Sequence, residues 1–273
     1  RLATGPKPAG PQLVSVQKFS AYGDMCQWDP ITAYTNRIAA SREENLFSSL
    51  QEGSVYAAAE GDTQMTDITR PPVRTIRDTY PTYSYVTVDT QFDEVILQDN
   101  NLWSIRVFNR TDNTPPTAPK TEPKRVIAGP KTEIQFNNGM YVDPKNGDIY
   151  SVESDTGDKV VVFGRDQKGD VEPKRILNTP HRGFGLAMNE EKQELYVTVQ
   201  YPPQVPVYRK TASGNDKPLR TLAGESTRLS DTHGMALDMK NKLMFINNWG
   251  HVSDYLTAGT GRMEDPSISI YPL

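Results

Sequence analysis

The sequence contains little cysteine, no long apolar run and no marked excess of either charge. Cys26 is the single cysteine among 273 residues, which excludes an internal disulfide framework and every motif built from paired cysteines. No apolar stretch approaches the length of a membrane-spanning helix, so we expect no transmembrane segment. Lys and Arg total 30 and Asp and Glu total 34, without a basic run that carries interleaved aromatic residues. The charge pattern therefore does not favour nucleic acid as a partner.

Several sequence motifs of catalysis are also absent. The chain has no Gly-rich phosphate loop, no nucleophile elbow and no HExxH sequence, and it contains only 3 histidines. It begins at Arg1 without a Met, and we interpret it as a processed or partial chain. The scarcity of cysteine fits a bacterial protein exported to an oxidising space, and it fits a cytoplasmic protein nearly as well. We expect an extracytoplasmic, secreted location.

What the sequence does contain is a unit that recurs along most of the chain with a period of about 50 residues. Each unit begins with Pro-x-Arg, and successive copies are 51, 50 and 45 residues apart, at Pro72, Pro123, Pro173 and Pro218. An apolar segment ending in Asp or Asn follows 16 to 20 residues later, at Asp89, Asp143, Asn189 and Asp238. A further apolar segment ends in an aromatic residue, at Phe108, Phe163, Tyr208 and Tyr271.

The central unit, residues 122–165, predicts four short strands per repeat. We expect them at Lys124–Ala128, Gly139–Val142, Ile149–Glu153 and Val160–Phe163. The last three are nearly continuous apolar runs, which is typical of strands in a sheet that is covered on both faces. A fixed period with four strands in each unit indicates an all-β fold, a β-propeller or array of four-stranded blades.

The first 70 residues depart from this pattern. Residues 1–11 are rich in Pro and Gly, and Leu13–Phe19 resembles the last strand of a repeat. Residues 30–60 predict a mainly helical insertion, because Asp29 and Pro30 form a helix start and Ser41–Glu44 matches a capping box. We therefore divide the chain into an N-terminal lead-in with a helical insertion, residues 1–70, and the repeats, residues 71–273.

Three segments of the repeats resemble the NHL and YVTN type of β-propeller repeat: NGMYVDPKNGDIYSVES, FGLAMNEEKQELYVTVQ and HGMALDMKNKLMFINNWG. The resemblance covers about residues 70–273 and is greatest to exported bacterial NHL-repeat proteins of unassigned function. It implies a propeller of about six blades around a channel lined by the innermost strands. Four to five blades are apparent in the chain, which favours a piece of a longer chain, and closure of the ring by the strand near Arg74 is the alternative.

The same resemblance leaves the function open, because the class includes protein-binding modules, ligand binders and a few metal-dependent lactonases and lyases. Those enzymes hold a divalent metal at the channel mouth, which makes His233, Asn138 and His181 the candidate ligands. His233 stands just before an inner strand, and the equivalent positions of the other units are Ser84, Asn138 and Phe184. A zinc site needs three or four protein ligands. The competing interpretation is that His233 is an ordinary channel-lining or turn residue and that no cofactor is bound.

Three other polar patterns have structural explanations. The Asp or Asn that ends each inner strand is predicted to be a turn residue whose side chain binds nearby backbone. The acidic loop with Glu153, Asp155 and Asp158 is predicted to be a solvated hairpin, with a calcium site as the alternative. The Pro-x-Arg arginines are expected on outer or edge strands, where ion pairs tie the blades together.

We predict that the chain is a non-catalytic interaction or scaffold module that binds a protein or another ligand through its blade loops. The long loops Thr111–Thr121 and Trp249–Asp265 are expected to form the recognising surface together with the helical insertion. Trp249, Tyr255 and Tyr201 are the expected aromatic anchors, because interface energy concentrates on such residues. The alternatives are a metal-dependent lactonase-like or lyase-like enzyme at the channel mouth and a structural subunit of an extracellular assembly.

Overall fold

The computed structural model describes residues 71–79, 81–252, 262–263 and 265–273. These residues belong to one compact unit, Pro71–Leu273. The N-terminal lead-in, the helical insertion expected over residues 30–60 and the anchor candidate Tyr255 lie outside the described residues. Helix in the described part is confined to two short 3-10 turns, η2 (Pro130–Thr132) and η3 (Glu225–Thr227). No helix in that part is long and apolar enough to span a bilayer.

The strands form four groups along the chain. The first group is β1 (Tyr83–Asp89), β2 (Glu94–Asp99), β3 (Ser104–Asn109) and β4 (Arg125–Ala128). The second is β5 (Phe136–Val142), β6 (Ile149–Ser154), β7 (Lys159–Phe163) and β8 (Arg175–Asn178). The third is β9 (Gly183–Asn189), β10 (Glu194–Val199), β11 (Gln204–Arg209) and β12 (Arg220–Ala223). The fourth is β13 (Thr232–Asp238), β14 (Leu243–Asn248) and β17 (Ser267–Pro272), interrupted by β15 (His251–Val252) and β16 (Arg262–Met263).

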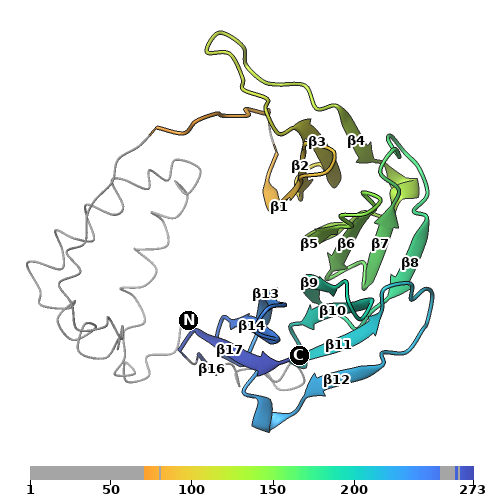
Figure 1. The fold of residues 1–273 in the computed structure, drawn as a ribbon, viewed down its shortest axis with the longest axis vertical. Coiled ribbons are helices and arrows are strands. Elements are labelled where there is room, and N and C mark those ends of the chain that lie inside the picture. Colours follow the sequence, from red (N-terminus) through yellow and green to blue (C-terminus); the bar gives the residue numbers. More distant parts are fainter. Residues whose placement is uncertain (1–70, 80, 253–261, 264) are drawn as a thin grey trace, which may run out of the picture. The chain divides into compact units, whose positions relative to one another are not determined.

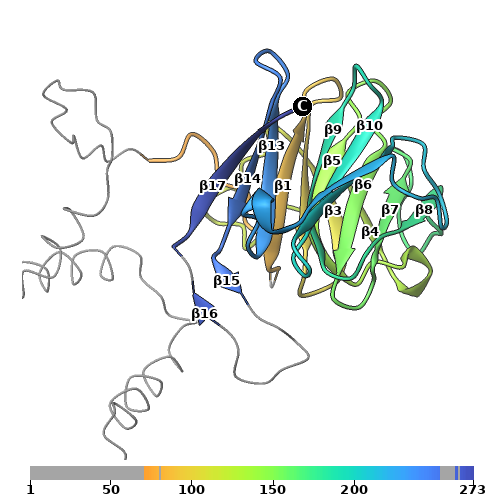
Figure 2. The same ribbon diagram turned by 90° about the horizontal axis from the view of Figure 1, so that it is seen from below.

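Each group forms one antiparallel sheet whose strands lie in sequence order, and β15 and β16 form a separate ladder. The four sheets, which we call blades 1 to 4, are arranged as an arc of a β-propeller (Figure 1). The inner strands β1, β5, β9 and β13 pack against one another in that order, while β4, β8 and β12 lie at the periphery. Figure 2 shows the blade strands running along one common direction, with β15 and β16 beyond one end of β14. The prediction of an all-β propeller with four-stranded blades is confirmed, and the described chain contains four blades.

The sequence repeat is out of phase with the blades. The strand expected at Lys124–Ala128 is β4, and it is the outer strand of blade 1, where Arg125 pairs with Val107 and Ile127 pairs with Ile105. A sequence unit that begins at Pro-x-Arg therefore combines the outer strand of one blade with the first three strands of the next blade. The sequence could not reveal this phase, because a four-strand period is the same whichever strand is counted first.

The Asp or Asn that ends each inner strand is a turn residue, as predicted. In every blade its side-chain oxygen accepts a backbone N–H two or three residues further along the chain. The bonds are Gln91 to Asp89 at 2.9 Å, Lys145 to Asp143 at 2.9 Å, Lys192 to Asn189 at 3.0 Å and Asn241 to Asp238 at 3.0 Å. These bonds fix the turn from the inner strand to the second strand.

Apolar layers fill the space between neighbouring blades, and they explain why the strands are continuously apolar. In β7, Val160 faces the layer between blades 2 and 3, and Val161 faces the layer between blades 1 and 2. Both valines are fully buried. Since successive side chains of a strand point to opposite faces, a blade between two neighbours requires apolar residues at both.

Glycines allow the inner strands to approach closely. A Cβ on Gly139 would lie 2.5 Å from the backbone oxygen of Phe184 in blade 3, and a Cβ on Gly185 would lie 2.5 Å from that of His233 in blade 4. A side chain at either position would force the neighbouring backbone to move. Gly139 and Gly185 occupy equivalent places in β5 and β9, which makes close approach a repeated feature of the axis.

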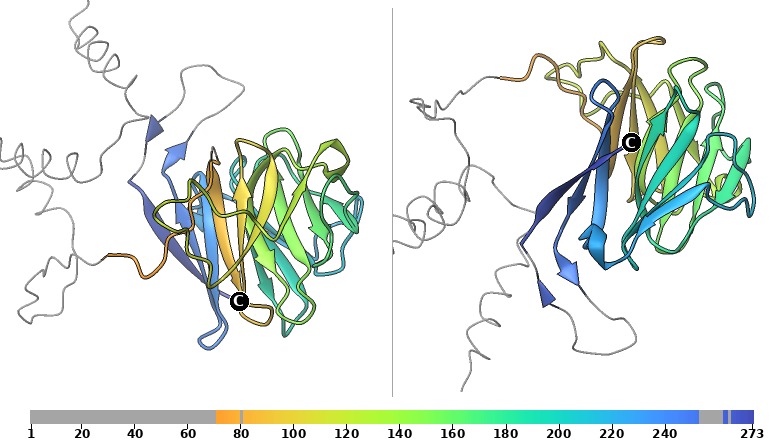
Figure 3. Two further views of the ribbon diagram at one scale, coloured as in Figure 1. Left: turned by 90° about the horizontal axis from the view of Figure 1, so that it is seen from above. Right: turned by 60° about the horizontal axis from the view of Figure 1, so that its bottom comes forward.

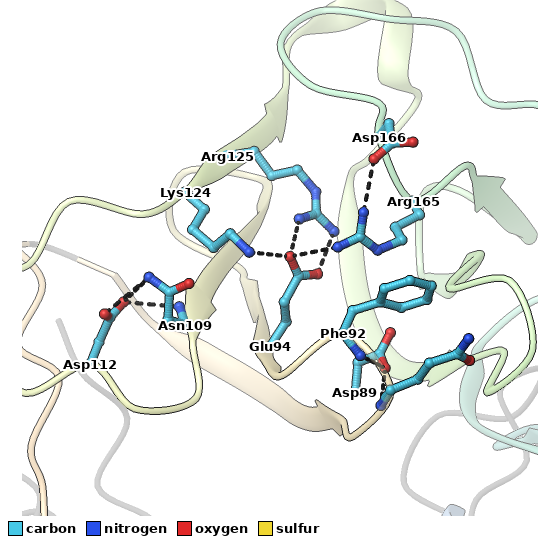
Figure 4. A network of polar contacts seen from close by, with 10 residues as sticks. Asp89, Phe92, Glu94, Asn109, Asp112, Lys124, Arg125, Arg165 and Asp166 are labelled. Carbon is cyan, nitrogen blue, oxygen red and sulfur yellow. Dashed lines mark hydrogen bonds and ion pairs between the residues drawn. The ribbon is translucent and has the colours of Figure 1, made fainter.

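A buried carboxylate joins blade 1 to blade 2 (Figure 4). Glu94, at the start of β2, accepts hydrogen bonds from Lys124 Nζ at 2.6 Å and from two nitrogens of Arg125 at 2.9 and 3.0 Å. Arg165 of blade 2 donates to the same carboxylate at 3.3 Å and stacks 3.9 Å from the centre of the Phe92 ring. Burial disfavours the ionised carboxylate, but hydrogen bonds and charges from Arg125 and Lys124 outweigh burial and lower the pKa of Glu94.

The Pro-x-Arg arginines of the later units lie on outer strands, as predicted. Arg220 of β12 donates to both oxygens of Glu194, at 2.7 and 2.8 Å. Arg175 of β8 differs, since it donates to the backbone oxygen of Lys210 at 2.8 Å. Arg125 and Arg220 therefore form ion pairs, but each pair lies within one blade, so the prediction that these ion pairs tie neighbouring blades together is wrong for them. The Arg175 bond does cross from blade 2 to blade 3.

The acidic segment at the end of β6, which includes Glu153, Asp155 and Asp158, is not solvated throughout. Glu153 is fully buried, and its carboxylate accepts the Ser151 hydroxyl at 2.6 Å and the backbone N–H of Gln135 at 2.7 Å. The prediction of a solvated loop is wrong for this residue, because its side chain turns inward to fix the segment before β5. Burial raises the pKa of Glu153 to about 7, against the opposing effects of these hydrogen bonds and of the Lys159 charge.

Candidate functional site

A cavity of about 610 Å³ lies where the four inner strands meet. Each blade contributes two residues of its inner strand: Ser84 and Tyr85, Phe136 and Asn138, Phe184 and Gly185, and His233 and Gly234. Asp155, Arg182, Gln200 and Trp249 complete the lining from segments that adjoin the strands. The four positions that the sequence analysis treats as equivalent, Ser84, Asn138, Phe184 and His233, therefore line one space.

Three aromatic rings form a stack at this cavity. His233 lies between Phe184, whose ring centre is 4.1 Å away, and Trp249, whose ring centre is 4.2 Å away with an interplanar angle of only 12°. Trp249 directly follows β14, and its backbone N–H donates to the oxygen of Asp231 at 3.1 Å. The indole nevertheless stays 58% exposed. Trp249 thus exposes a large aromatic surface to solvent, while its indole packs on the His233 ring.

Polar groups beneath the stack fix the His233 ring. Asp231 is buried, has a left-handed backbone with φ of 50°, and places Oδ1 3.1 Å from His233 Nε2. Gln200 donates to the same Oδ1 at 2.5 Å and lies 3.2 Å from Nε2. Burial lowers the pKa of His233 and outweighs the charge and hydrogen bond of Asp231, which act in the opposite direction. At neutral pH the imidazole is therefore neutral and stacks as an aromatic ring.

Blades 2 and 3 supply further polar side chains of the cavity, beside Ser84 and Tyr85 of blade 1. Arg182 lies 3.4 Å from Oδ1 of Asp155 and 3.3 Å from the Gln200 side-chain oxygen. The amide nitrogen of Asn138 is buried and has no hydrogen-bond partner among the described residues. A buried donor without a partner is costly. Because this nitrogen has almost no exposed area, the Asn138 side chain must turn toward the cavity before an acceptor oxygen there can reach it.

The candidate metal ligands do not form a metal site in the described part of the chain. His233 and Asn138 line the cavity together, but His181 is absent from its lining and lies 2.9 Å from Asp158. No three His, Cys, Asp or Glu side chains of the described residues are grouped as a metal requires. One engaged imidazole and one amide do not fit a resident divalent cation.

The aromatic anchor candidates have different surroundings. Trp249 lines the cavity and is exposed, whereas Tyr201 is only 8% exposed. The Tyr201 hydroxyl lies 2.6 Å from Nδ1 of His251 in β15, and the guanidinium of Arg182 lies 5.8 Å from its ring centre. Tyr201 thus connects blade 3 to β15 and the cavity residue Arg182, and it offers little surface of its own.

Sequence reasoning did not select Phe184, Arg182 or Asp231 as site residues. Phe184 occupies the position equivalent to His233, so the repeat register carried a signal for it. Arg182 and Asp231 precede inner strands and have left-handed backbone conformations, with φ of 65° and 50°. No feature of the local sequence indicated those conformations. The backbone oxygen of each residue accepts an N–H from the far end of the neighbouring strand, from Gln200 to Arg182 and from Trp249 to Asp231.

Comparison with known proteins supports the fold and leaves the function open. No protein family matches the sequence, and no curated protein is similar to it. Among solved structures, hydrazine synthase from Kuenenia stuttgartiensis has a TM-score of 0.51 over 75% of this chain at 12% sequence identity. The match covers 49% of the hydrazine synthase chain, so the present chain spans about half of that structure. At this identity the similarity is one of fold alone.

Proposed function

We propose that the chain is a non-catalytic binding module whose axial cavity takes a peptide segment of a protein partner. The observation that carries this proposal is the Phe184–His233–Trp249 stack, which leaves Trp249 58% exposed at the cavity. Large aromatic residues held in a fixed position are typical centres of binding energy. A volume of about 610 Å³ is also within the usual range for ligand sites.

The polar lining favours a peptide as the occupant. A backbone carbonyl or side-chain carboxylate can accept an N–H of Asn138 once its side chain has turned toward the cavity, while an apolar side chain packs on Trp249. Phe136 is 39% exposed and lines the same cavity from blade 2, which adds a second apolar contact. Peptides combine apolar side chains and acceptor oxygens at short spacing, so both parts of the site are used together.

Peptide selection tests the proposal. A random peptide library is selected on the full unsubstituted chain alone, and the affinity of the recovered peptides for this chain and for Trp249→Ala is measured by fluorescence polarisation. We expect Trp249→Ala to weaken binding by about 30-fold or more, the effect of losing an aromatic hot spot. The matched control is Trp103→Ala, because Trp103 is also 58% exposed and lies on the β2–β3 turn outside the cavity.

Two outcomes contradict the proposal. The first is that recovered peptides bind Trp249→Ala as tightly as the unsubstituted chain. The second is that Trp249→Ala lowers the free energy of unfolding by as much as it weakens the free energy of peptide binding, which would make the residue structural.

The alternatives drawn from the sequence have less support. A metal-dependent reaction requires a ligand set, and no three His, Cys, Asp or Glu side chains of the described residues are grouped as such a set. Membership of the NHL-repeat class and an extracytoplasmic location remain predictions from the sequence.

A further inference from the structure

The three junctions between neighbouring blades have one design. Each blade presents an outgoing pair of side chains, two residues apart on its third strand, to an incoming pair on the inner strand of the next blade. The outgoing pairs are Ile105 and Val107, Val160 and Val162, and Val205 and Val207. The incoming pairs are Met140 and Val142, Leu186 and Met188, and Met235 and Leu237.

Burial at these junctions is nearly complete. All six outgoing side chains are at most 3% exposed, and the incoming pairs of blades 2 and 3 are at most 8% exposed. Met235 and Leu237 of blade 4 are partly buried and pack on the same apolar layer as Val205 and Val207. The packing of an outgoing pair on an incoming pair is therefore the repeated apolar contact of the fold.

At the two ends of the arc, the same pairs have no neighbouring blade in the part of the chain that the structure describes. In blade 1 the incoming pair is Val86 and Val88, which are 59% and 48% exposed. In blade 4 the outgoing pair is Ile268 and Ile270, which are 67% and 56% exposed. Figure 1 shows blades 1 and 4 at the two ends of the series of sheets, and Figure 3 gives two further views of it, with β1 in orange and blade 4 in blue. Both end faces are thus unfilled copies of a junction that is filled three times within the chain.

The backbone shows the same incompleteness. In two of the three filled junctions, the residue three positions after the Pro-x-Arg proline accepts a hydrogen bond from the next blade, from Gly169 to Val126 and from Gly214 to Ile176, both at 2.7 Å. Thr75 occupies this position after Pro72, and its oxygen accepts the N–H of Thr114 of blade 1 at 2.8 Å. Residues 71–78 therefore lie where the outer strand of a preceding blade belongs.

Blade 4 lacks the element that residues 71–78 represent. Its third strand, β17, has no outer strand beside it among the described residues, whereas β3, β7 and β11 are each covered by one. Its end face also has a hollow of about 220 Å³ lined by Ala236, Phe245 and Ile268. Among the described residues, one end of the arc thus has an outer strand without its blade, and the other end has a blade without its outer strand.

We infer that a second copy of this chain covers these faces, head to tail. Ile268 and Ile270 of one copy pack on Val86 and Val88 of the other, and residues 71–78 of the second copy lie beside β17 of the first. The occupant is a second copy because both halves of the junction are present on one chain and each has the chemistry of the partners already paired inside it. Such a contact joins two different faces, so it closes into a ring when the rotation permits. Propellers have roughly four to eight blades, so two four-blade copies already reach about eight and complete the ring.

This assembly is independent of the proposed peptide site, and sedimentation analysis of the full chain tests it. We expect the unsubstituted chain to be a dimer. Val86→Asp or Ile268→Asp should raise the dissociation constant of the dimer by about 30-fold or more, since each substitution places a charge in an apolar contact. Leu102→Asp is the matched control, because Leu102 is 49% exposed on the β2–β3 turn, and it should remain a dimer. Val88→Thr and Ile270→Thr provide milder variants that keep a β-branched side chain if the Asp variants do not fold.

Mixing the two face variants distinguishes head-to-tail contact from a symmetric one. A Val86→Asp chain keeps its outgoing face and an Ile268→Asp chain keeps its incoming face, so the mixture should form a one-to-one heterodimer through one intact junction. Failure of the mixture to associate overturns the head-to-tail arrangement. An unsubstituted chain that sediments as a monomer overturns the inference as well. This includes a monomer in which solvent labelling shows Val86 and Ile268 to be protected, because another part of the same polypeptide would then cover them.

Discussion

The buried carboxylate of Glu153 makes the stability of the propeller depend on pH. Its side chain is fully buried in blade 2, where burial raises its pKa from the ordinary 4.5 to about 7. A raised pKa means that the folded chain retains a proton which the unfolded chain releases. The free energy of unfolding therefore falls as the pH rises from about 4.5 to about 7.

The size of the effect follows from the shift. Each pKa unit corresponds to about 1.4 kcal/mol, so a shift of about 2.5 units destabilises the fold by about 3 kcal/mol at pH values above the folded pKa. Glu153→Gln removes the charge and keeps the acceptor for the Gln135 N–H, while its amide can donate to the Ser151 hydroxyl. We expect this variant to be about 3 kcal/mol more stable than the unsubstituted chain at about pH 8, and the difference should fall to about 1 kcal/mol at about pH 5.

Urea unfolding followed by tryptophan fluorescence at both pH values measures this difference. Glu225→Gln is the control, because it makes the same chemical change at an exposed position and should give no difference at either pH. An equal stability gap between Glu153→Gln and the unsubstituted chain at both pH values would refute the reasoning, since titration of Glu153 would then contribute nothing.

Two further pairs of variants test the buried ion pairs and the close approach of the inner strands. Glu94→Gln should destabilise the chain by about 3 kcal/mol, because Arg125 loses the counter-charge of a buried pair. Glu194→Gln should destabilise it by only about 1 kcal/mol, because the partner Arg220 is 46% exposed. Equal urea midpoints for these two variants would contradict that ranking. Gly139→Ala should lower stability by roughly 1–3 kcal/mol, because its Cβ would lie 2.5 Å from the Phe184 backbone oxygen. Gly234→Ala should cost less, since its Cβ would meet only the Asn247 side chain at 3.0 Å, and the reverse order in thermal melts would argue against close packing of the inner strands.

Local patterns predicted the strands and turns but not the way in which strands are grouped. Val160 and Val161 are apolar in succession because blade 2 has neighbours on both faces, and the sequence carried that information directly. The Asp and Asn turn residues were also predictable, because their side chains bind backbone only two or three residues away. The phase of the blades was not, since the pairing of β4 with β3 depends on contacts across the loop between them.

The site was partly predictable for the same reason. The register of the repeat placed Asn138 and His233 in equivalent positions, and both line the cavity. The stacking of Phe184, His233 and Trp249 was not predictable, because the rings come from two blades and meet only after the blades have packed. Glu153 was assigned to solvent because it lies at a strand end, whereas the hydrogen bond from Gln135, 18 residues earlier, turns it inward.

Fluorine NMR of the full chain labelled with 5-fluorotryptophan tests the central claim most directly, namely that the axial stack is a binding surface. The chain has 3 tryptophans, so the resonances of Trp103 and Trp249 can be assigned by replacing each residue with Phe in turn. When a selected peptide is titrated, the Trp249 resonance should shift to saturation while the Trp103 resonance stays in place. A peptide that binds without moving the Trp249 resonance would show that the surface lies elsewhere.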